Sequence, residues 1–398
     1  MKNIKFDLAS DSWGEEEKTA IERVIGSNRY TMGSEVRAFE DAVRSMFGVK
    51  HTVMVNSGSS ANLVMLAALQ IKMQNDFPEK PEVIVPAVSW STTFTPFYYL
   101  KMTPVFVDVD PTTFGVSVEK VKQAINSNTV AIFAVNVLGQ PAELDALEQV
   151  AKDNNLVLIE DNCESLGASL NGRYTGSFGL AASHSSFFSH HISTMEGGWI
   201  TTNDDEMYEL CLALRAHGWI REQPNNSSLR SGVGGGVNSL FHFVVPGLNF
   251  RPLEMEGAIG VEQLKKLDAM NEWRLKNNEL FKRLFSQSRN VRLQGGPGQS
   301  SSFALPLLLT GELSGRRDEL ALVFQESGIE CRPIIAGNFT KQPVMRFFDS
   351  PSPGPLPVAD KIHEDGLYLG NHPRDLGLEI ESAWSTFSQF ERRHGVGR

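Results

Sequence analysis

Short apolar runs alternate with longer amphipathic stretches through the first half of the 398-residue chain. The short runs are rich in Val, Ile and Leu and predict strands, at residues 52–55, 82–85, 105–109, 130–136 and 156–161. Apolar residues recur at helical spacing between them, at residues 61–72, 118–125 and 143–153. Because strands that are apolar throughout need cover on both faces, the pattern predicts an α/β fold with a mainly parallel sheet.

Glycine, proline and serine punctuate the last third of the chain, beyond a long helical stretch at residues 254–284. Loops rich in these residues, at 295–301 and 350–357, separate shorter apolar runs, which is typical of a small α+β unit. We therefore expect two domains. Residues 1–265 would form a large α/β domain with an N-terminal helical segment, and residues 266–398 a smaller C-terminal α+β domain.

Composition and charge narrow the range of functions. The net charge of −10 argues against non-specific nucleic-acid binding, which needs an excess of Lys and Arg. No apolar run is long enough to span a bilayer, and the first residues lack the apolar core of a secretory signal. The three cysteines are far apart, so we expect neither a disulfide framework nor a Cys-ligated metal or iron–sulfur site. A cytoplasmic protein is the simplest interpretation.

The segment NSGSSAN, residues 56–62, follows a predicted strand and opens a helix. Gly58 allows the backbone to approach a ligand closely, and the free N–H groups of a first helical turn favour an anion. The segment predicts a phosphate-binding turn. Because many turns contain Ser-Gly-Ser, a helix cap without a ligand is the alternative.

Asp161 ends a predicted strand of apolar residues, where an unpaired carboxylate is costly. A protonated pyridine nitrogen would explain this placement, because such a pairing turns the ring into an electron sink. A helix cap or an internal ion pair is the alternative, and this strand by itself favours that alternative. Trp90, after the strand at 82–85, is suited either to offset stacking on an aromatic ring or to the core.

The segment SSFFSHHISTMEGG, residues 185–198, predicts a strand at 185–188, a polar turn, and a Glu-Gly-Gly turn into another strand at 199–202. The polar turn contains His190 and His191. A histidine here is either a base, a structural residue bonded to the backbone, or half of a metal-binding pair. Adjacent residues of an extended segment point to opposite sides, so the pair is a poor chelate and we expect no metal.

The order and spacing of these segments resemble the sugar aminotransferase family of fold-type I pyridoxal-phosphate (PLP) enzymes over nearly the whole chain. The resemblance rests on NRYTMGSEVRAFE, VMVNSGSSANL, VIVPAVSWSTT, PVFVDVD, AVNVLGQPAELD, LIEDNCESLGA, GSFG, SSFFSHHISTMEGG, RAHGW, GLNFRPLEMEGAIG and GIECRPI. It implies these cofactor-binding roles: Gly58, Ser59 and Ser185 at the phosphate, Trp90 stacked on the pyridine ring, Asp161 at the ring nitrogen and Glu164 near the ring hydroxyl.

The resemblance also implies a homodimer with shared active sites. Asn249 would reach the cofactor phosphate of the neighbouring subunit. His217 and Arg221, in the segment RAHGWIR, would contact the substrate.

The family normally carries a lysine that bonds to PLP at the position of His190. Imidazole cannot form that bond, so the amine form of the cofactor, pyridoxamine phosphate (PMP), would be held by non-covalent contacts alone. A neutral imidazole with a pKa near neutrality is suited to act as the base. The resemblance is greatest to histidine-bearing members, which implies a PMP-dependent 3-dehydratase. Its substrate would be a nucleotide-linked, and by resemblance GDP-linked, 4-keto-6-deoxy sugar, with L-glutamate restoring PMP and ammonia released.

Two other functions stay open for such a chain. One is a nucleotide-sugar aminotransferase that works without the lysine, and the other is a catalytically silent cofactor-binding protein on the same fold. A related 3-dehydrase that carries an iron–sulfur cluster is disfavoured, because this chain lacks clustered cysteines. Residues 222–239, rich in Gly, Ser and Asn, lie in the corresponding region and predict either a surface loop or a lid.

Overall fold

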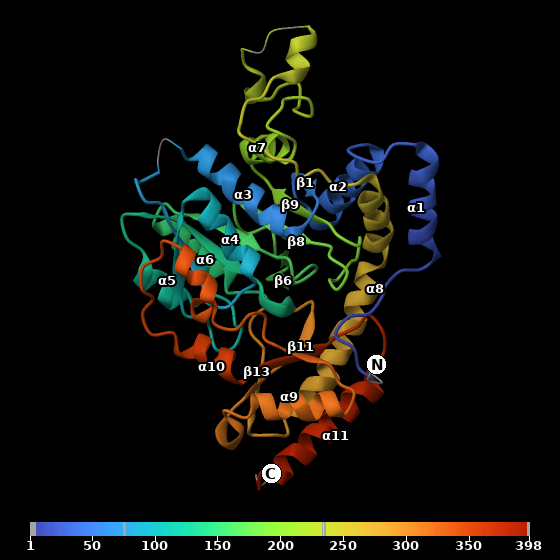
Figure 1. Ribbon diagram of the computed structural model, residues 1–398, viewed down its shortest axis with the longest axis vertical. Helices are drawn as coiled ribbons and strands as arrows, with labels where there is room; N and C mark the ends of the chain where they lie inside the picture. Colours follow the sequence, from blue (N-terminus) through green and yellow to red (C-terminus); the bar gives the residue numbers. More distant parts are fainter. Residues whose placement is uncertain (1–4, 75–76, 233, 235, 396–398) are drawn as a thin grey trace.

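A seven-stranded mixed sheet forms the centre of the large domain in the computed structural model, which describes residues 5–74, 77–232, 234 and 236–395 (Figure 1). The strand order is β1-β9-β8-β5-β4-β2-β3. The strands are β1 (His51–Val55), β2 (Glu82–Pro86), β3 (Thr103–Val107), β4 (Thr129–Val135), β5 (Val157–Asp161), β8 (Ala181–Ser185) and β9 (Gly198–Thr202). Pairing is parallel from β3 through β8, and only β9 runs antiparallel to both of its neighbours. The predicted α/β fold with a mainly parallel sheet is confirmed.

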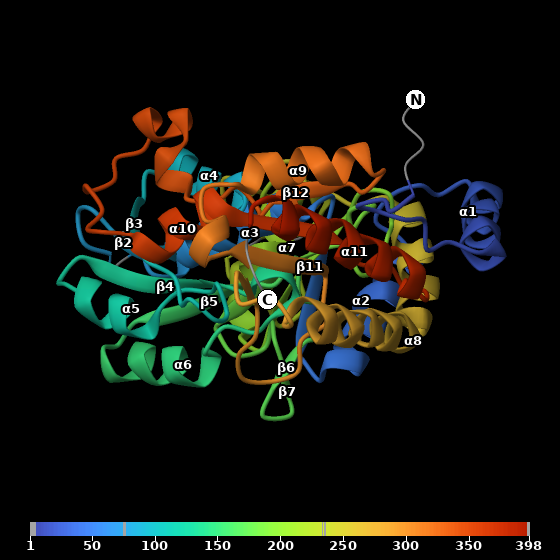
Figure 2. The same ribbon diagram turned by 90° about the horizontal axis from the view of Figure 1, so that it is seen from below.

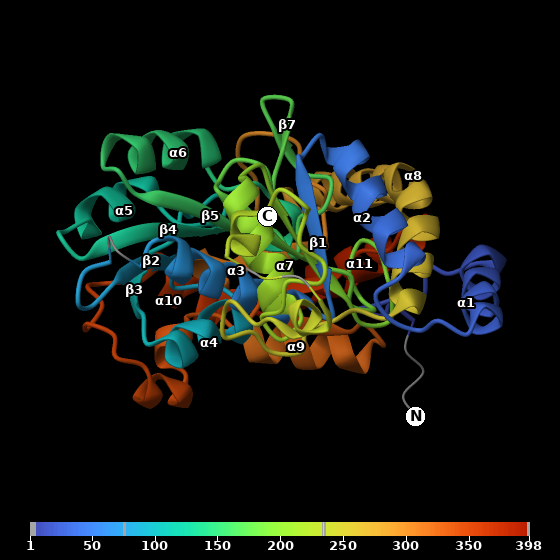
Figure 3. The ribbon, with the colours of Figure 1, turned by 90° about the horizontal axis from the view of Figure 1, so that it is seen from above.

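Helices cover both faces of this sheet, as the uniformly apolar strands require. One apolar core lies under α3, α4 and α7, and a second lies on the opposite face under α5 and α6 (Figure 3). The bounds of these helices are α3 (Gly58–Lys72), α4 (Ser91–Leu100), α5 (Val118–Ala124), α6 (Leu144–Asp153) and α7 (Asp205–Arg215). A small hairpin connects β5 to β8, with strands β6 (Ser169–Leu170) and β7 (Arg173–Tyr174).

A four-stranded antiparallel sheet, in the order β10-β11-β13-β12, forms the C-terminal part of the chain. Its strands are β10 (Val291–Leu293), β11 (Ala304–Leu309), β12 (Cys331–Pro333) and β13 (Gly366–Gly370). Three helices accompany the sheet (Figure 2): α9 (Arg317–Glu326), α10 (Pro357–Asp365) and α11 (Gly377–Arg393). A separate apolar core lies between the sheet, α9 and α11, as expected for a small α+β unit.

The 32-residue helix α8 (Glu254–Phe285) joins the two sheets. It packs on the N-terminal helices α1 (Glu15–Ser27) and α2 (Ser34–Phe47) and, further along, on α11. The expected boundary between residues 265 and 266 lies inside this continuous helix. None of the helices in the described ranges has an apolar stretch long enough to cross a membrane.

The segment between α7 and α8 extends away from the body of the molecule (Figure 1). It has little regular structure beyond two short 3₁₀ turns. Several of its large apolar side chains are more than half exposed, namely Val237, Phe241, Phe243 and Leu248. This density of exposed apolar groups is typical of a surface that another molecule covers.

Glu254, at the start of α8, caps a different helix. Its Oε1 accepts from the backbone N–H groups of Gly33 and Val36, at 2.6 and 3.1 Å, and its Oε2 accepts from Glu35 N–H at 3.1 Å. These donors belong to the first turn of α2, which has no side-chain cap of its own. The carboxylate is buried, so it replaces water at a helix end that is otherwise unsatisfied.

We expect Glu254→Ala to lower the free energy of unfolding by about 3 kcal/mol, because several hydrogen bonds to a charged group are lost and buried donors remain unpaired. Chemical denaturation monitored by circular dichroism measures the change. The matched control is Glu272→Ala on the same helix, where an exposed carboxylate pairs with Lys276, and the expected loss is below about 0.5 kcal/mol. Equal effects of the two substitutions would contradict the capping role.

Candidate active site

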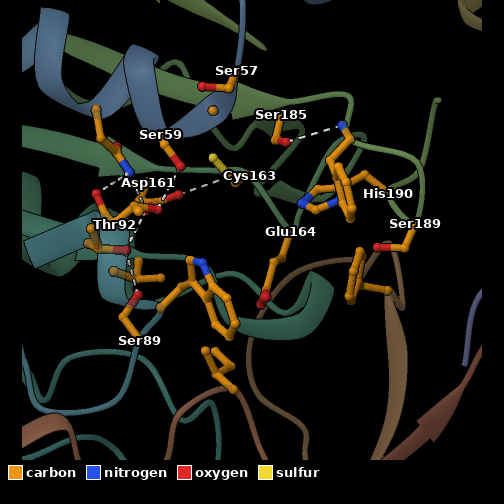
Figure 4. Close-up of a pocket in the computed structure, with 18 of the residues that line it drawn as sticks. Ser57, Ser59, Ser89, Thr92, Asp161, Cys163, Glu164, Ser185, Ser189 and His190 are labelled. Atoms are coloured by element: carbon orange, nitrogen blue, oxygen red, sulfur yellow. Dashed lines mark hydrogen bonds between the residues drawn. The ribbon is translucent and has the colours of Figure 1, made fainter. Parts of the chain in front are cut away.

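A cavity of about 370 Å³ lies at the carboxyl ends of β4, β5 and β8, between the large and small sheets. Seven predicted cofactor-binding and catalytic residues line it together: Gly58, Ser59, Trp90, Asp161, Glu164, Ser185 and His190. Figure 4 shows Ser59, Asp161, Glu164, Ser185 and His190 around this space. The small domain contributes Phe303, Arg332, Ile335 and Tyr368 to the wall. The cavity therefore lies where ligands bind in parallel α/β sheets, beyond the carboxyl ends of the strands.

The first turn of α3 forms one end of the cavity. Ser57 caps the helix by accepting from Ser60 N–H at 3.1 Å, so the preceding strand leads directly into a helix N-terminus that faces the cavity. Gly58 packs tightly here, because a Cβ at this position would lie 2.7 Å from Ser185 Cβ and 2.9 Å from Cys163 Sγ. Free backbone N–H groups, the helix dipole and neighbouring hydroxyls suit this end to a phosphate.

Asp161 is buried and is held entirely by neutral donors. Its Oδ2 accepts from Asn62 Nδ2 at 3.0 Å and from Thr93 Oγ1 at 2.8 Å, and its Oδ1 accepts from Cys163 N–H at 3.2 Å. No ion pair among the described residues includes Asp161, so the alternative of an internal ion pair is wrong. The carboxylate is fixed in direction and available to a cation in the cavity.

Trp90 is 56% exposed and stands at the start of α4 on the cavity wall. The alternative of a core tryptophan is therefore wrong. An exposed indole beside a cavity that also presents Asp161 is suited to stack on a flat ring.

Glu164 lies on the cavity wall and accepts from Leu138 N–H at 3.0 Å through Oε2. Burial, with a smaller contribution from the nearby Asp161 charge, raises the pKa of this carboxyl to about 7. A carboxyl in this state can donate or accept a proton close to neutral pH.

His190 also faces the cavity, between the rings of Phe187 and Phe303 at centroid distances of 5.9 and 5.3 Å (Figure 4). Its Nδ1 is buried without a hydrogen-bond partner. Burial lowers the pKa of His190 to about 4, and the Arg274 charge contributes to the lowering. The imidazole is therefore neutral at pH 7 as expected, although its pKa is lower than the near-neutral value anticipated.

His191 is buried on the other side of the same turn, and its Nε2 lies 3.2 Å from Ser301 O. The two histidines thus face different surroundings, which explains why they make a poor chelate. Among the described residues no group of three His, Cys, Asp or Glu side chains is arranged to hold a metal ion.

The strand predicted at residues 185–188 is wrong in its position, because β8 ends at Ser185 and the following residues leave the sheet. Two contacts from distant segments fix the turn that follows. Ser193 N–H donates to Gln263 Oε1 at 3.0 Å, and Ser193 O accepts from Trp13 Nε1 at 2.9 Å. Irregular backbone pairing persists beyond the sheet, because Ser186 N–H donates to Gly197 O and Phe188 N–H donates to Met195 O, both at 3.0 Å.

Three predicted residues lie outside this cavity, on the segment between α7 and α8 or at its base. The backbone of Asn249 pairs with Ala216, and its Oδ1 accepts from Arg251 Nε at 3.0 Å. The guanidinium of Arg221 lies 4.3 and 4.4 Å from the ring centroids of Trp219 and Phe241. His217 packs edge-on against Trp219. The predicted role of Asn249 requires a second subunit, and the roles of all three residues stay predictions.

Sequence reasoning missed several residues that line the cavity or hold its groups: Asn62, Thr93, Phe303, Arg332 and Tyr368. Asn62 and Arg332 lie in segments, NSGSSANL and GIECRPI, whose pattern was noticed without a role for these side chains. Phe303 and Tyr368 follow ordinary apolar strand patterns, and only the packing of the small domain brings them to the cavity.

A family model described as the DegT/DnrJ/EryC1/StrS aminotransferase family matches residues 11–381. The chain belongs to this family. One relative, a GDP-4-keto-6-deoxy-D-mannose 3-dehydratase from Yersinia pseudotuberculosis, is 46% identical over 96% of this chain and 98% of its own length.

Two solved members of the family superpose closely. An Escherichia coli GDP-4-keto-6-deoxy-D-mannose-3-dehydratase with bound hydrated PLP is 41% identical, with a TM-score of 0.93 over 96% of this chain and 99% of its own. A GDP-4-keto-6-deoxymannose-3-dehydratase with a trapped PLP-glutamate geminal diamine is 40% identical, with a TM-score of 0.92 over 96% and 100%.

The residues of the cavity fit the cofactor of this family. One space is bordered by a helix N-terminus suited to phosphate, an exposed indole and a fixed carboxylate. Gly58 packs so closely on Ser185 that a Cβ on Gly58 would disturb the phosphate end. The position that normally bonds the cofactor is a neutral histidine with an unpartnered Nδ1.

We expect the stability of the cofactor-free chain to fall as pH rises from 5 to 8, in part because of Glu164. A carboxyl whose folded pKa is raised to about 7 favours folding while protonated, and this contribution is lost between its ordinary pKa of 4.5 and the raised value. Glu164→Gln keeps an acceptor for Leu138 N–H and cannot ionise. Its denaturation midpoint should exceed that of the wild type by about 2 °C at pH 8 and match it at pH 5.

The exposed carboxylate Glu272 provides the control for this comparison. Glu272→Gln should show no gain at pH 8. If Glu164→Gln were no more stable than the wild type at pH 8, the raised pKa would be wrong.

Proposed function

We propose that this chain is a PMP- and PLP-dependent nucleotide-sugar 3-dehydratase that acts on GDP-4-keto-6-deoxy-D-mannose. The observation that carries the proposal is a cavity lined by all the predicted cofactor-binding residues except Asn249, in which His190 replaces the lysine. The identity of 46% to a dehydratase that acts on this sugar supports the choice of substrate.

When bound, PMP supplies an amine that condenses with the 4-keto group and a ring that accepts an electron pair. The α3 N-terminus, with Gly58, Ser59 and Ser185, would hold its phosphate. Trp90 would stack on the ring. These contacts have to hold the cofactor alone, because imidazole forms no stable bond to it.

Asp161 would face the ring nitrogen with a carboxylate that Asn62 and Thr93 already orient. Since its hydrogen bonds come from neutral groups, its negative charge remains available to keep that nitrogen protonated. Glu164 would lie near the ring hydroxyl, where a carboxyl with a pKa of about 7 can share a proton.

His190 is neutral at pH 7 and would accept a proton at an imidazole nitrogen from the methylene carbon of the cofactor. The imidazolium that forms can return this proton to the hydroxyl leaving C3. Because burial makes imidazolium unfavourable here, the proton is released readily. The Phe187 and Phe303 rings pack edge-on against the imidazole and would help to fix its orientation.

The reaction balances with glutamate as the reductant. The sugar loses its C3 hydroxyl and gains hydrogen, glutamate is oxidised to 2-oxoglutarate, and its nitrogen leaves as ammonia. A cytoplasmic location would agree with the three unpaired cysteines.

The assay that tests this function is mass spectrometry of GDP-4-keto-6-deoxy-D-mannose after incubation with the protein, PLP and L-glutamate. We expect a product that has lost one oxygen and kept its carbonyl, together with one ammonia per turnover. A product in which the carbonyl has become an amine would establish an aminotransferase instead. Unchanged substrate would favour another nucleotide sugar or a silent protein.

The matched variants are His190→Asn and His190→Lys. His190→Asn removes the base and should lower kcat at least about 100-fold, the usual range for a general base. His190→Lys should bond covalently to PLP, change the cofactor absorbance and shift the outcome toward amination. An unaltered cofactor spectrum in His190→Lys would count against the role of this position.

We also propose a homodimer in which Asn249 completes the site of the partner subunit. Asn249 lies outside the cavity of its own chain, at the base of a segment with exposed Phe241, Phe243 and Leu248. A two-fold dimer would cover these side chains and create two equivalent sites. His217 and Arg221, on the same segment, would then be placed to contact the nucleotide sugar.

Mixing two inactive variants tests this arrangement. If Asn249 acts in the partner's site, a mixed dimer of Asn249→Ala and His190→Asn has one site with both defects and one site with none. Random exchange of subunits should then restore about a quarter of the wild-type activity. A mixture that stays inactive after exchange, verified by native mass spectrometry, would place Asn249 in its own site.

A further inference from the structure

Arg274 of α8 is a buried cation that forms no ion pair with any of the described residues. Its Nη1 donates to the carbonyl oxygens of Asn371 and, at 3.4 Å, Phe303, while its Nε has no hydrogen-bond partner. Burial alone lowers the pKa of Arg274 to about 10, with no carboxylate contributing. A buried charge without a counterion costs several kcal/mol, so its presence calls for an explanation beyond packing.

Three histidines lie around this guanidinium: His190, which is partly exposed to the cavity, and the buried His191 and His372. Burial is the largest cause of the lowered pKa of each, and the positive charge of Arg274 is the second. The cation therefore acts on the whole cluster. Of its members, His190 alone lines the cavity.

Phe303 contacts both Arg274 and His190 and so links their positions. Its carbonyl is bound by the guanidinium, and its ring packs on His190 and His191 at 5.3 and 5.6 Å. Asn371 completes this clamp, because its Nδ2 donates to Arg274 O at 3.0 Å and to Ser302 O at 2.7 Å. The residue before Phe303 and the helix that carries Arg274 are thus tied together.

We propose that Arg274 is a positioning residue for His190: it holds Phe303 against the imidazole and keeps a fixed positive charge beside it. The consequence is that His190 meets the substrate as an uncharged base. This inference rests on the proposed role of His190 as the base, and it adds a residue that touches neither substrate nor cofactor.

Other ionisable groups also lie around His190, and the effect of the Arg274 charge has to be compared with theirs. They are Asp161, Glu164, Glu196, Cys163, Arg332 and Tyr368 on the cavity wall, with His191 behind the turn. Burial and the Arg274 charge, and none of the groups on the wall, account for the lowered pKa of His190. Arg274 is not among the residues that line the cavity, so its charge acts without occupying space that the substrate needs.

The test is side-chain ¹H–¹⁵N NMR of histidine in the full-length, cofactor-free chain between pH 5 and 8, with the His190 signal assigned by its absence in His190→Asn. We expect His190 to stay neutral throughout this range in the wild type and in Arg274→Lys, which keeps the charge. In Arg274→Gln the titration should move to higher pH by about one unit, within the range for loss of a neighbouring charge. Lys276→Gln, which removes an exposed cation from the same helix, should behave as the wild type.

Kinetics provide the second readout. In Arg274→Gln the acid limb of the kcat profile should move to higher pH by the same amount, with KM for the sugar within about twofold, whereas Arg274→Lys keeps the wild-type profile. An unchanged His190 titration in Arg274→Gln overturns the proposal, as does protonation of His190 near pH 6.5 in the wild type. Because the NMR experiment needs no turnover, it stands even where the dehydratase assay fails.

Phe303→Leu tests whether the Phe303 ring positions the His190 imidazole. It also provides a test if Arg274→Gln does not fold. This variant keeps the carbonyl that Arg274 binds and loses the ring contact with His190. We expect more than one His190 signal and a kcat at least about 10-fold lower, since small misplacements of a catalytic group are costly. A single wild-type signal with unchanged kcat would overturn the positioning role.

Discussion

The close packing of the first turn of α3 against the ends of β8 and β9 is the constraint on which the site depends. A Cβ on Gly58 would collide with Ser185 and Cys163, and one on Gly198 would lie 2.4 Å from the backbone N of Gly58. Only with glycine at both positions can the helix N-terminus enter the sheet edge where Asp161 ends β5. This approach brings an anion-binding helix end, a fixed carboxylate and the histidine turn to one cavity.

Burial, more than ion pairing, determines the protonation states of the groups around that cavity. Asp161 is oriented by amide, hydroxyl and backbone donors, so its charge remains directed at the ligand. Burial is the main cause that raises the pKa of Glu164 and lowers that of His190, which leaves one carboxyl near its titration point and one uncharged imidazole on the wall of the same cavity. Arg274 contributes from outside the cavity. Low dielectric makes each of these groups sensitive to its neighbours, which is how one fold serves different reactions.

Much of the large domain and most of its site could be predicted from the sequence, because the relevant signals are local. Uniformly apolar runs specify a buried parallel sheet, and polar residues at the strand ends, such as Asp161, fall at a common edge. Gly58, in a turn between a strand and a helix, predicts that the backbone approaches a ligand closely. The replacement of lysine by His190 is visible in one turn. These residues lie within short segments whose order along the chain is preserved in space.

Other features depend on contacts between residues far apart in the chain, and no local pattern encodes them. The apolar run at 185–188 resembles a strand, yet the regular strand ends at Ser185, and Gln263 and Trp13 fix the turn that follows through Ser193. Phe303 and Arg274 meet His190 only because the small domain packs across α8. The sequence alone therefore specifies the kinds of chemical group and the sheet edge where they gather, since periodicity and turn chemistry are local. Protonation states and the exact walls of the cavity come from tertiary packing, because burial and electrostatic coupling act through space.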